Sequence, residues 1–122
     1  MIDIKLNIRP MPSPRPRLSK NRTYMPSKYV SHKKLLQSKF IGLKKFGNVP
    51  LRVELFFGVK PSKNVKGNKY ATPYMDADNC AKTVLDAMNG ILYPDDVMIE
   101  ELMITKKYAT VDCIFIQIKE IK

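Results

Sequence analysis

Acidic residues with the chemistry of metal ligands are concentrated in one short segment of a basic chain. Residues 76–101 contain seven of the eleven acidic residues and a single base, Lys82, so the segment has a formal charge of −6. The whole chain carries +11, which leaves +17 on the remainder. A basic surface suits a polyanion such as nucleic acid, but a carboxylate cluster on it repels that polyanion unless a cation intervenes. Mg²⁺ binds one or two carboxylates together with phosphate oxygens, so the pattern favours a metal-dependent enzyme acting on phosphodiesters.

The spacing within the segment indicates which side chains could act together. Asp76 and Asp78 open an expected helix, and Lys82 follows Asp78 by four residues, which places both on one helix face. Asp95 and Asp96 come after the helix and its turn, where we expect the chain to fold back beside the helix N-terminus. Two or three carboxylates could hold a metal that polarises a phosphoryl oxygen and activates water. A lysine beside them could stabilise the charge of the transition state.

Simpler interpretations of the same residues remain open at this stage. Asp76 and Asp78 could only cap the helix, with Lys82 paired to Asp78 on the surface. The D-x-D motif also occurs in glycosyltransferases, although the short chain and the lack of a nucleotide-binding pattern disfavour that class. Asp95 could simply serve the turn after Pro94. The other acidic residues of the segment are expected to be structural or solvent-facing: Asp86, Glu100 and Glu101.

Hydrophobic periodicity predicts the elements that position these residues. Apolar residues alternate over four segments, which predicts strands over 2–9, 49–59, 97–108 and 111–121. Helical spacing predicts helices over 28–46, ending at Gly47, and over 76–89. The last two strands are expected to form a hairpin through Tyr108–Thr110. The order β-α-β-α-β-β predicts an α+β fold, in which one domain over residues 1–122 has a mixed or antiparallel sheet of about four strands with two helices.

The remaining composition limits the function classes. No segment has the length of a signal-peptide core or a membrane span, so we expect a cytoplasmic protein without membrane association. Cys80 and Cys113 are isolated in the sequence, which disfavours zinc and predicts buried free thiols. His32 is expected on the solvent side of the first helix rather than as a general base.

Basic residues of two expected loops, over 9–28 and 60–69, and of the first helix are the candidates for DNA contact. Arg and Lys side chains would follow phosphates, and a tyrosine could stack on an opened base. The tyrosines interleaved with these bases are Tyr24, Tyr29, Tyr70 and Tyr74. The basic candidates are Arg15, Arg17, Lys20, Arg22, Lys28, Lys63, Lys66 and Lys69.

Residues 75–106, MDADNCAKTVLDAMNGILYPDDVMIEELMITK, resemble the RusA family of Holliday-junction resolvases. The shared pattern is D-x-D-N-x-x-K, then L-D-A, then D-D before an apolar strand. The proline-containing basic loop and the lysine-rich helix of the first half agree with it, so the resemblance covers nearly the whole chain.

The resemblance implies a homodimer that binds branched DNA with four arms and cuts it by paired symmetrical nicks. It further implies dependence on Mg²⁺ or Mn²⁺, 5′-phosphate and 3′-hydroxyl ends, a role in DNA recombination and repair, and no small-molecule cofactor. Carried over by position, Asp76, Asp78 and Asp96 would be metal ligands and Lys82 the catalytic lysine. The gap before Asp95-Asp96 is about one residue shorter than in some members, so Asp95 remains the alternative to Asp96 as the third ligand.

Two other classes compete with this interpretation. A basic nucleic-acid-binding protein without catalysis would explain the charge of the chain but not the acidic segment. A nuclease of the D…E-x-K type is disfavoured, because the acidic segment, residues 76–101, contains no E-x-K.

Overall fold

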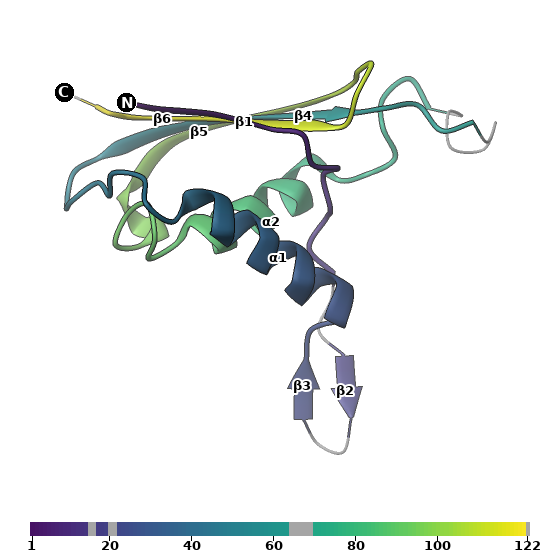
Figure 1. Ribbon diagram of the computed structural model, residues 1–122, viewed down its shortest axis with the longest axis horizontal. Coiled ribbons are helices and arrows are strands. Elements are labelled where there is room, and N and C mark those ends of the chain that lie inside the picture. The colour runs from purple at the N-terminus through teal and green to yellow at the C-terminus, as the bar shows by residue number, and fades with distance from the viewer. Residues whose placement is uncertain (15–16, 20–21, 64–69, 122) are drawn as a thin grey trace.

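The computed structural model describes residues 1–14, 17–19, 22–63 and 70–121, with only the backbone described for 17–19 and 22–24. The elements are β1 (Ile2–Leu6), β2 (Arg17–Ser19), β3 (Arg22–Tyr24), α1 (Ser27–Phe40), β4 (Leu51–Val59), α2 (Ala77–Met88), the 3₁₀ helix η2 (Asp96–Met98), β5 (Ile99–Tyr108) and β6 (Cys113–Glu120). This order confirms the predicted α+β class. The β2–β3 ribbon, which projects from the start of α1 away from the main sheet, was not predicted (Figure 1). No helix in the described part of the chain has the length and apolarity needed to cross a membrane.

The main sheet has four strands in the order β1-β6-β4-β5. β4 and β5 are parallel, because the connection between them contains α2, whereas β6 is antiparallel to both β1 and β4. The expected hairpin of the last two strands is therefore wrong. β6 buries Cys113, Ile114, Ile116 and Ile118 and takes a central position, while the more exposed β5 lies at the edge.

A glycine allows the chain to pass from β5 to β6 across the end of β4. The Ala109 N–H donates to the Val59 carbonyl at 3.0 Å, which fixes the connection against that end. A Cβ added at Gly58 would lie 2.5 Å from Cys113 Sγ and 2.9 Å from Ala109 Cβ. The crossing thus requires a residue without a side chain at position 58.

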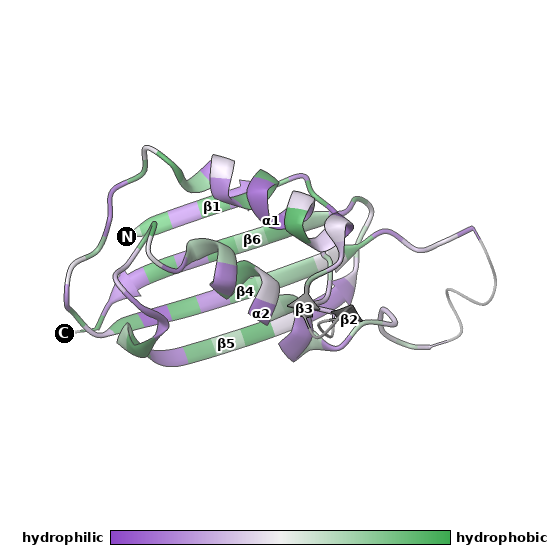
Figure 2. Cartoon of the chain, turned by 90° about the horizontal axis from the view of Figure 1, so that it is seen from below, coloured by the Kyte–Doolittle hydropathy of each residue, from purple (hydrophilic) through white to green (hydrophobic). Residues whose placement is uncertain are grey.

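Both helices cover the same face of the sheet, with α1 nearer β1 and β6 and α2 nearer β4 (Figures 1 and 2). β4 supplies Leu51, Val53, Leu55 and Phe57 to the core. The helices supply Leu36, Phe40, Val84 and Met88 to the same core. Burial of these side chains is the main force that holds the helices on the sheet.

The first helix is shorter than its sequence periodicity predicts. α1 ends at Phe40, and Gly42 follows with φ +92°, a left-handed conformation that suits glycine after a helix. Phe46 is nevertheless buried, because its N–H donates to the Leu92 carbonyl at 2.8 Å and ties the loop to the core. The expected helix end at Gly47 is therefore wrong, because residues 41–46 form a loop after α1.

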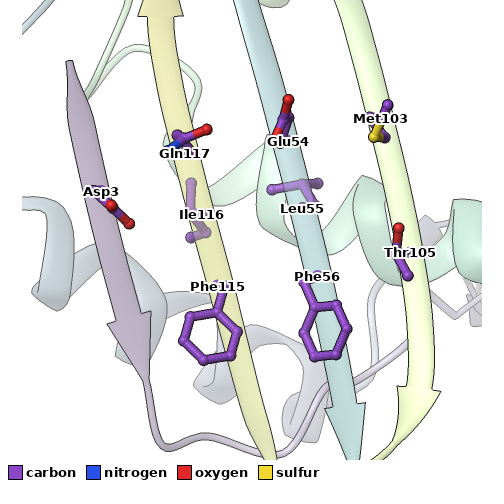
Figure 3. A pocket seen from close by; sticks show the side chains of 9 residues that line it. All are labelled: Asp3, Glu54, Leu55, Phe56, Met103, Thr105, Phe115, Ile116 and Gln117. Carbon is purple, nitrogen blue, oxygen red and sulfur yellow. The ribbon is translucent and has the colours of Figure 1, made fainter.

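The opposite face of the sheet is not covered by either helix (Figure 1). Phe56 and Phe115 lie side by side there, with ring centroids 5.6 Å apart (Figure 3). Asp3, Glu54, Met103 and Gln117 complete a shallow hollow of about 290 Å³ around the two rings. This face combines an apolar centre with a polar surround.

Candidate functional site

The N-terminus of α2 presents two carboxylates that the fold itself does not use. Asp76 is the N-cap residue with extended backbone (φ −73°, ψ 126°), yet its carboxylate makes no capping hydrogen bond. It instead accepts a hydrogen bond from Asn79 Nδ2 at 3.3 Å. Asp78 and Lys82 are both exposed, and no ion pair joins them; the ion pairs among the described residues are Arg9–Asp112 and Arg52–Glu101. The simple interpretation of a cap and a surface pair is therefore not what the structure contains.

A lysine of β5 holds the loop that leads into Asp76. Lys106 Nζ donates to the Pro73 carbonyl at 2.8 Å and to the Met75 carbonyl at 2.5 Å. Sequence reasoning missed Lys106. The signal was its position two residues after Ile104 on the covered face of a strand, where an ammonium group needs partners.

The N-terminal loop closes the other side of the same site. The Ser13 N–H donates to the Asn79 carbonyl at 3.0 Å, which ties this loop to the first turn of α2. Between this loop and residues 70–76 lies a pocket of about 520 Å³. Its lining is Pro12, Ser13, Pro14, Tyr70, Thr72, Pro73, Tyr74, Met75, Asp76, Asn79 and Lys106. Residues 12–14 and residues 70–76 therefore meet beside Asp76.

Asp96 lies toward the other end of α2, contrary to expectation. Its carboxylate accepts a hydrogen bond from the hydroxyl of the buried Tyr93 at 2.7 Å, and that hydroxyl is 3.5 Å from the Leu85 carbonyl. Leu85 follows Asp78 by seven residues, which is roughly 10 Å along a helix axis. The turn stays there because Tyr93 is buried and its carbonyl accepts the Gly90 N–H at 2.9 Å.

The carboxylates near Asp96 have identifiable structural roles. Burial raises the pKa of Asp96, the Tyr93 hydrogen bond opposes this, and the charges of Asp86 and Asp95 raise the pKa further. Asp86 accepts a hydrogen bond from the Tyr29 hydroxyl at 3.2 Å and so links α2 to α1. Asp95 accepts from the Val97 N–H at 3.2 Å and serves the turn.

The residues at the N-terminus of α2 fit a divalent cation of the hard type. Asp76 and Asp78 supply two carboxylates at the positive end of a helix dipole, and Mg²⁺ commonly completes such a pair with water and phosphate oxygens. Within the described ranges, no group of three His, Cys, Asp or Glu side chains is arranged to hold a metal. The arrangement is an open two-carboxylate site, with Asp96 apart from it.

The structure describes the side chains of only some of the basic residues that are candidates for DNA contact. Lys28 and Lys63 are exposed, as contact with phosphates requires. Arg17 and Arg22 lie in the β2–β3 ribbon, of which only the backbone is described. The remaining basic candidates lie outside the described residues: Arg15, Lys20, Lys66 and Lys69.

Three further expectations concern single side chains. Cys80 and Cys113 are buried free thiols, as predicted. Tyr29 is only 4% exposed and cannot stack on a base, because its ring is buried on the inner side of α1 and its hydroxyl donates to Asp86 of α2. His32 is partly buried rather than solvent-side, and this burial lowers its pKa.

Comparison with known proteins assigns the chain to a family. The family model described as "Endodeoxyribonuclease RusA" matches residues 7–119, which include both helices, the β2–β3 ribbon and all the candidate site residues. The comparison with curated proteins gives no match. The chain therefore belongs to the RusA family of endodeoxyribonucleases.

Proposed function

We propose that this protein resolves four-way (Holliday) DNA junctions by paired symmetrical nicks that require Mg²⁺ or Mn²⁺ and leave 5′-phosphate and 3′-hydroxyl ends, in DNA recombination and repair. The observation that carries the proposal is the pair of exposed carboxylates at the N-terminus of α2, which take part in neither a cap nor an ion pair. A family of endodeoxyribonucleases supplies the reaction class, and the charge of +17 outside residues 76–101 suits a DNA substrate.

Asp76 and Asp78 would hold the cation, which when bound lowers the pKa of an attacking water and offsets charge on the phosphate. Asn79 orients the Asp76 carboxylate by its hydrogen bond, and the Lys106 contacts fix the backbone just before it. Lys82 projects from the next turn of α2 and would donate to the non-bridging phosphate oxygens. The family pattern alone supports Asp96 as a third metal ligand, since its carboxylate lies toward the other end of α2.

A non-catalytic nucleic-acid-binding protein is a weaker alternative. Such a protein would keep the basic loops but would gain nothing from two unpaired carboxylates, which repel phosphate at the surface. Asp76 also makes no capping hydrogen bond that would account for its presence.

We also propose that the protein acts as a C2 homodimer that uses the uncovered face of the sheet. A four-way junction presents two equivalent strands, and a two-fold enzyme supplies one site to each. Phe56 and Phe115 form an apolar centre, and the 61% exposed Met103 lies beside Glu54 on the same face. The surrounding charged residues have both signs, as a self-complementary contact needs. The surrounding charges are Asp3, Lys5, Arg52, Glu54, Glu101 and Lys119.

The test compares a synthetic four-way junction with a linear duplex of the same arm sequence, with and without Mg²⁺. The wild type should cut only the junction and only with the metal. Asp78→Asn should bind the junction but not cut it, whereas Glu100→Gln, which removes an equal charge from the same acidic segment, should cut at the wild-type rate. Equal cutting of duplex and junction, or full activity of folded Asp78→Asn, would contradict the proposal.

A further inference from the structure

Two tyrosines beside the candidate metal ligand form a stacked pair. The rings of Tyr70 and Tyr74 have centroids 5.1 Å apart and an interplanar angle of 13°. Both line the 520 Å³ pocket that also contains Asp76 and Asn79, and Tyr74 is 78% exposed. The hydrophobic core accounts for neither ring, since neither tyrosine belongs to it.

We propose that this pocket receives one unpaired DNA base from the branch point, with Tyr74 as its stacking platform. This inference rests on the proposed function and adds the part of the substrate that the pocket recognises. An exposed aromatic face stacks on any base, because every base has a π face. Tyr70 backs Tyr74, so the ring is already held in a stacking orientation before DNA arrives.

The pocket walls suit a heteroaromatic ring better than a charged or an aliphatic group. Pro12, Pro14, Pro73 and Met75 supply apolar surface, and a small number of polar groups, including the Asn79 amide, lie among them. In such a pocket the faces of a base pack against apolar side chains, and the polar groups form hydrogen bonds with its edge.

Both walls of the pocket are fixed to the body of the protein. The Ser13–Asn79 backbone hydrogen bond anchors the proline-containing wall to α2. The two Lys106 hydrogen bonds anchor the wall that carries Pro73 and Met75 to β5. A pocket held in this way requires little ordering when the base enters.

The position of Asp76 in the lining identifies the occupant as part of the DNA that is cut. A nucleotide whose base fills the pocket has its own phosphates within one backbone unit of the base, and therefore close to Asp76 and Asp78. Stacking would thus select an opened branch point and bring its phosphodiester to the carboxylates, whereas fully paired duplex offers no free base.

The experiment measures junction affinity in EDTA, where no cutting occurs. Tyr74→Ala should weaken binding about 5- to 150-fold, the range expected for loss of one base–aromatic stack. Tyr74→Phe should restore most of this loss because it retains the ring, and Val111→Ala, which trims an exposed apolar residue of the β5–β6 connection, should change nothing. Circular dichroism checks that each variant is folded.

A scan with abasic sites locates the base. A single abasic nucleotide is moved along each strand at the branch point. At one position, the abasic site should weaken junction binding by the wild type by the same factor as the Tyr74→Ala substitution does. At that position it should weaken junction binding by the Tyr74→Ala variant no further. The inference would be overturned if Tyr74→Ala bound the junction as tightly as the wild type does. It would also be overturned if the losses of affinity from the substitution and from the abasic site multiplied at every position.

The outcomes separate this inference from the proposed function. If the wild type cuts junctions with Mg²⁺ while Tyr74→Ala binds and cuts like the wild type, the resolvase function stands and the base pocket is wrong. If the wild type cuts no junction but the Tyr74 and abasic losses coincide, the base pocket stands and the resolvase function is wrong.

Discussion

Lys106→Met should damage both the stability and the activity of the protein, because this lysine holds the loop in front of Asp76. Its amine donates to two carbonyls, at 2.8 Å and 2.5 Å, and a hydrogen bond from a charged group contributes about 1.5–3 kcal/mol. Two such bonds give an upper range of about 3–6 kcal/mol. Lys106 is only partly buried, so water replaces some of the loss, and we expect about 3 kcal/mol in urea denaturation.

The effect on catalysis follows from the loss of position rather than of charge. Residues that orient metal ligands are commonly worth 10- to 100-fold in activity, so cleavage of the four-way junction should fall by about that factor. Lys107→Met is the matched control, since Lys107 is exposed, neighbours Lys106 and carries the same charge. Lys106→Arg should retain most of the stability. If Lys106→Met and Lys107→Met have equal stabilities and equal cleavage rates, the positioning role of Lys106 is refuted.

Four further predictions follow from named contacts. Lys82→Ala should lower single-turnover cleavage at saturating enzyme by about 10²- to 10³-fold; loss of affinity with unchanged turnover would make it a binding residue. Asp96→Asn should raise the free energy of unfolding at pH 7. The pKa of Asp96 is raised in the folded protein, so stability falls as pH rises from the unfolded-state pKa of about 3.9 through the folded-state pKa, and asparagine removes that loss. Identical dependence of stability on pH in the wild type and the variant would count against this. Gly58→Ala should cost about 1–3 kcal/mol by overpacking against Cys113 and Ala109, with partial rescue by Cys113→Ala; wild-type stability would show that the crossing has room. Junction affinity should fall with a slope of about −0.7 to −0.9 in log K per log salt for each phosphate contacted, and flat affinity would contradict a basic DNA surface.

Local patterns predicted those parts of the fold that depend on neighbouring residues. The helix expected over 76–89 is α2, Ala77–Met88, because its apolar face, its acidic N-terminus and Gly90 (φ +80°) all agree. The strand expected over 49–59 is β4, Leu51–Val59, in which buried and partly buried positions alternate over the first six residues. The class and the element order followed from these segments.

Features that depend on distant packing were not predictable in the same way. Alternation in β5 and β6 indicates two strands but not that β6 inserts beside β4, a choice that depends on which strand has the more apolar surface. The position of Asp96 depends on the burial of Tyr93, which keeps the turn at the C-terminal half of α2. The spacing after Ile104 places Lys106 on the covered face of β5, but its bonds to the Pro73 and Met75 carbonyls depend on β5 passing these residues, which lie more than 30 positions earlier in the chain.

Paired nicking of a four-way junction is the central claim, and a supercoiled plasmid that extrudes a cruciform tests it most directly. Two coordinated nicks across the cruciform base convert the plasmid to a linear form, whereas independent nicks give an open circle that loses the cruciform. With Mg²⁺, the wild type should yield linear plasmid from the first time points, and a plasmid without the inverted repeat should stay intact. Accumulation of open circles ahead of linear product, or equal cutting of both plasmids, would contradict a dimeric junction resolvase.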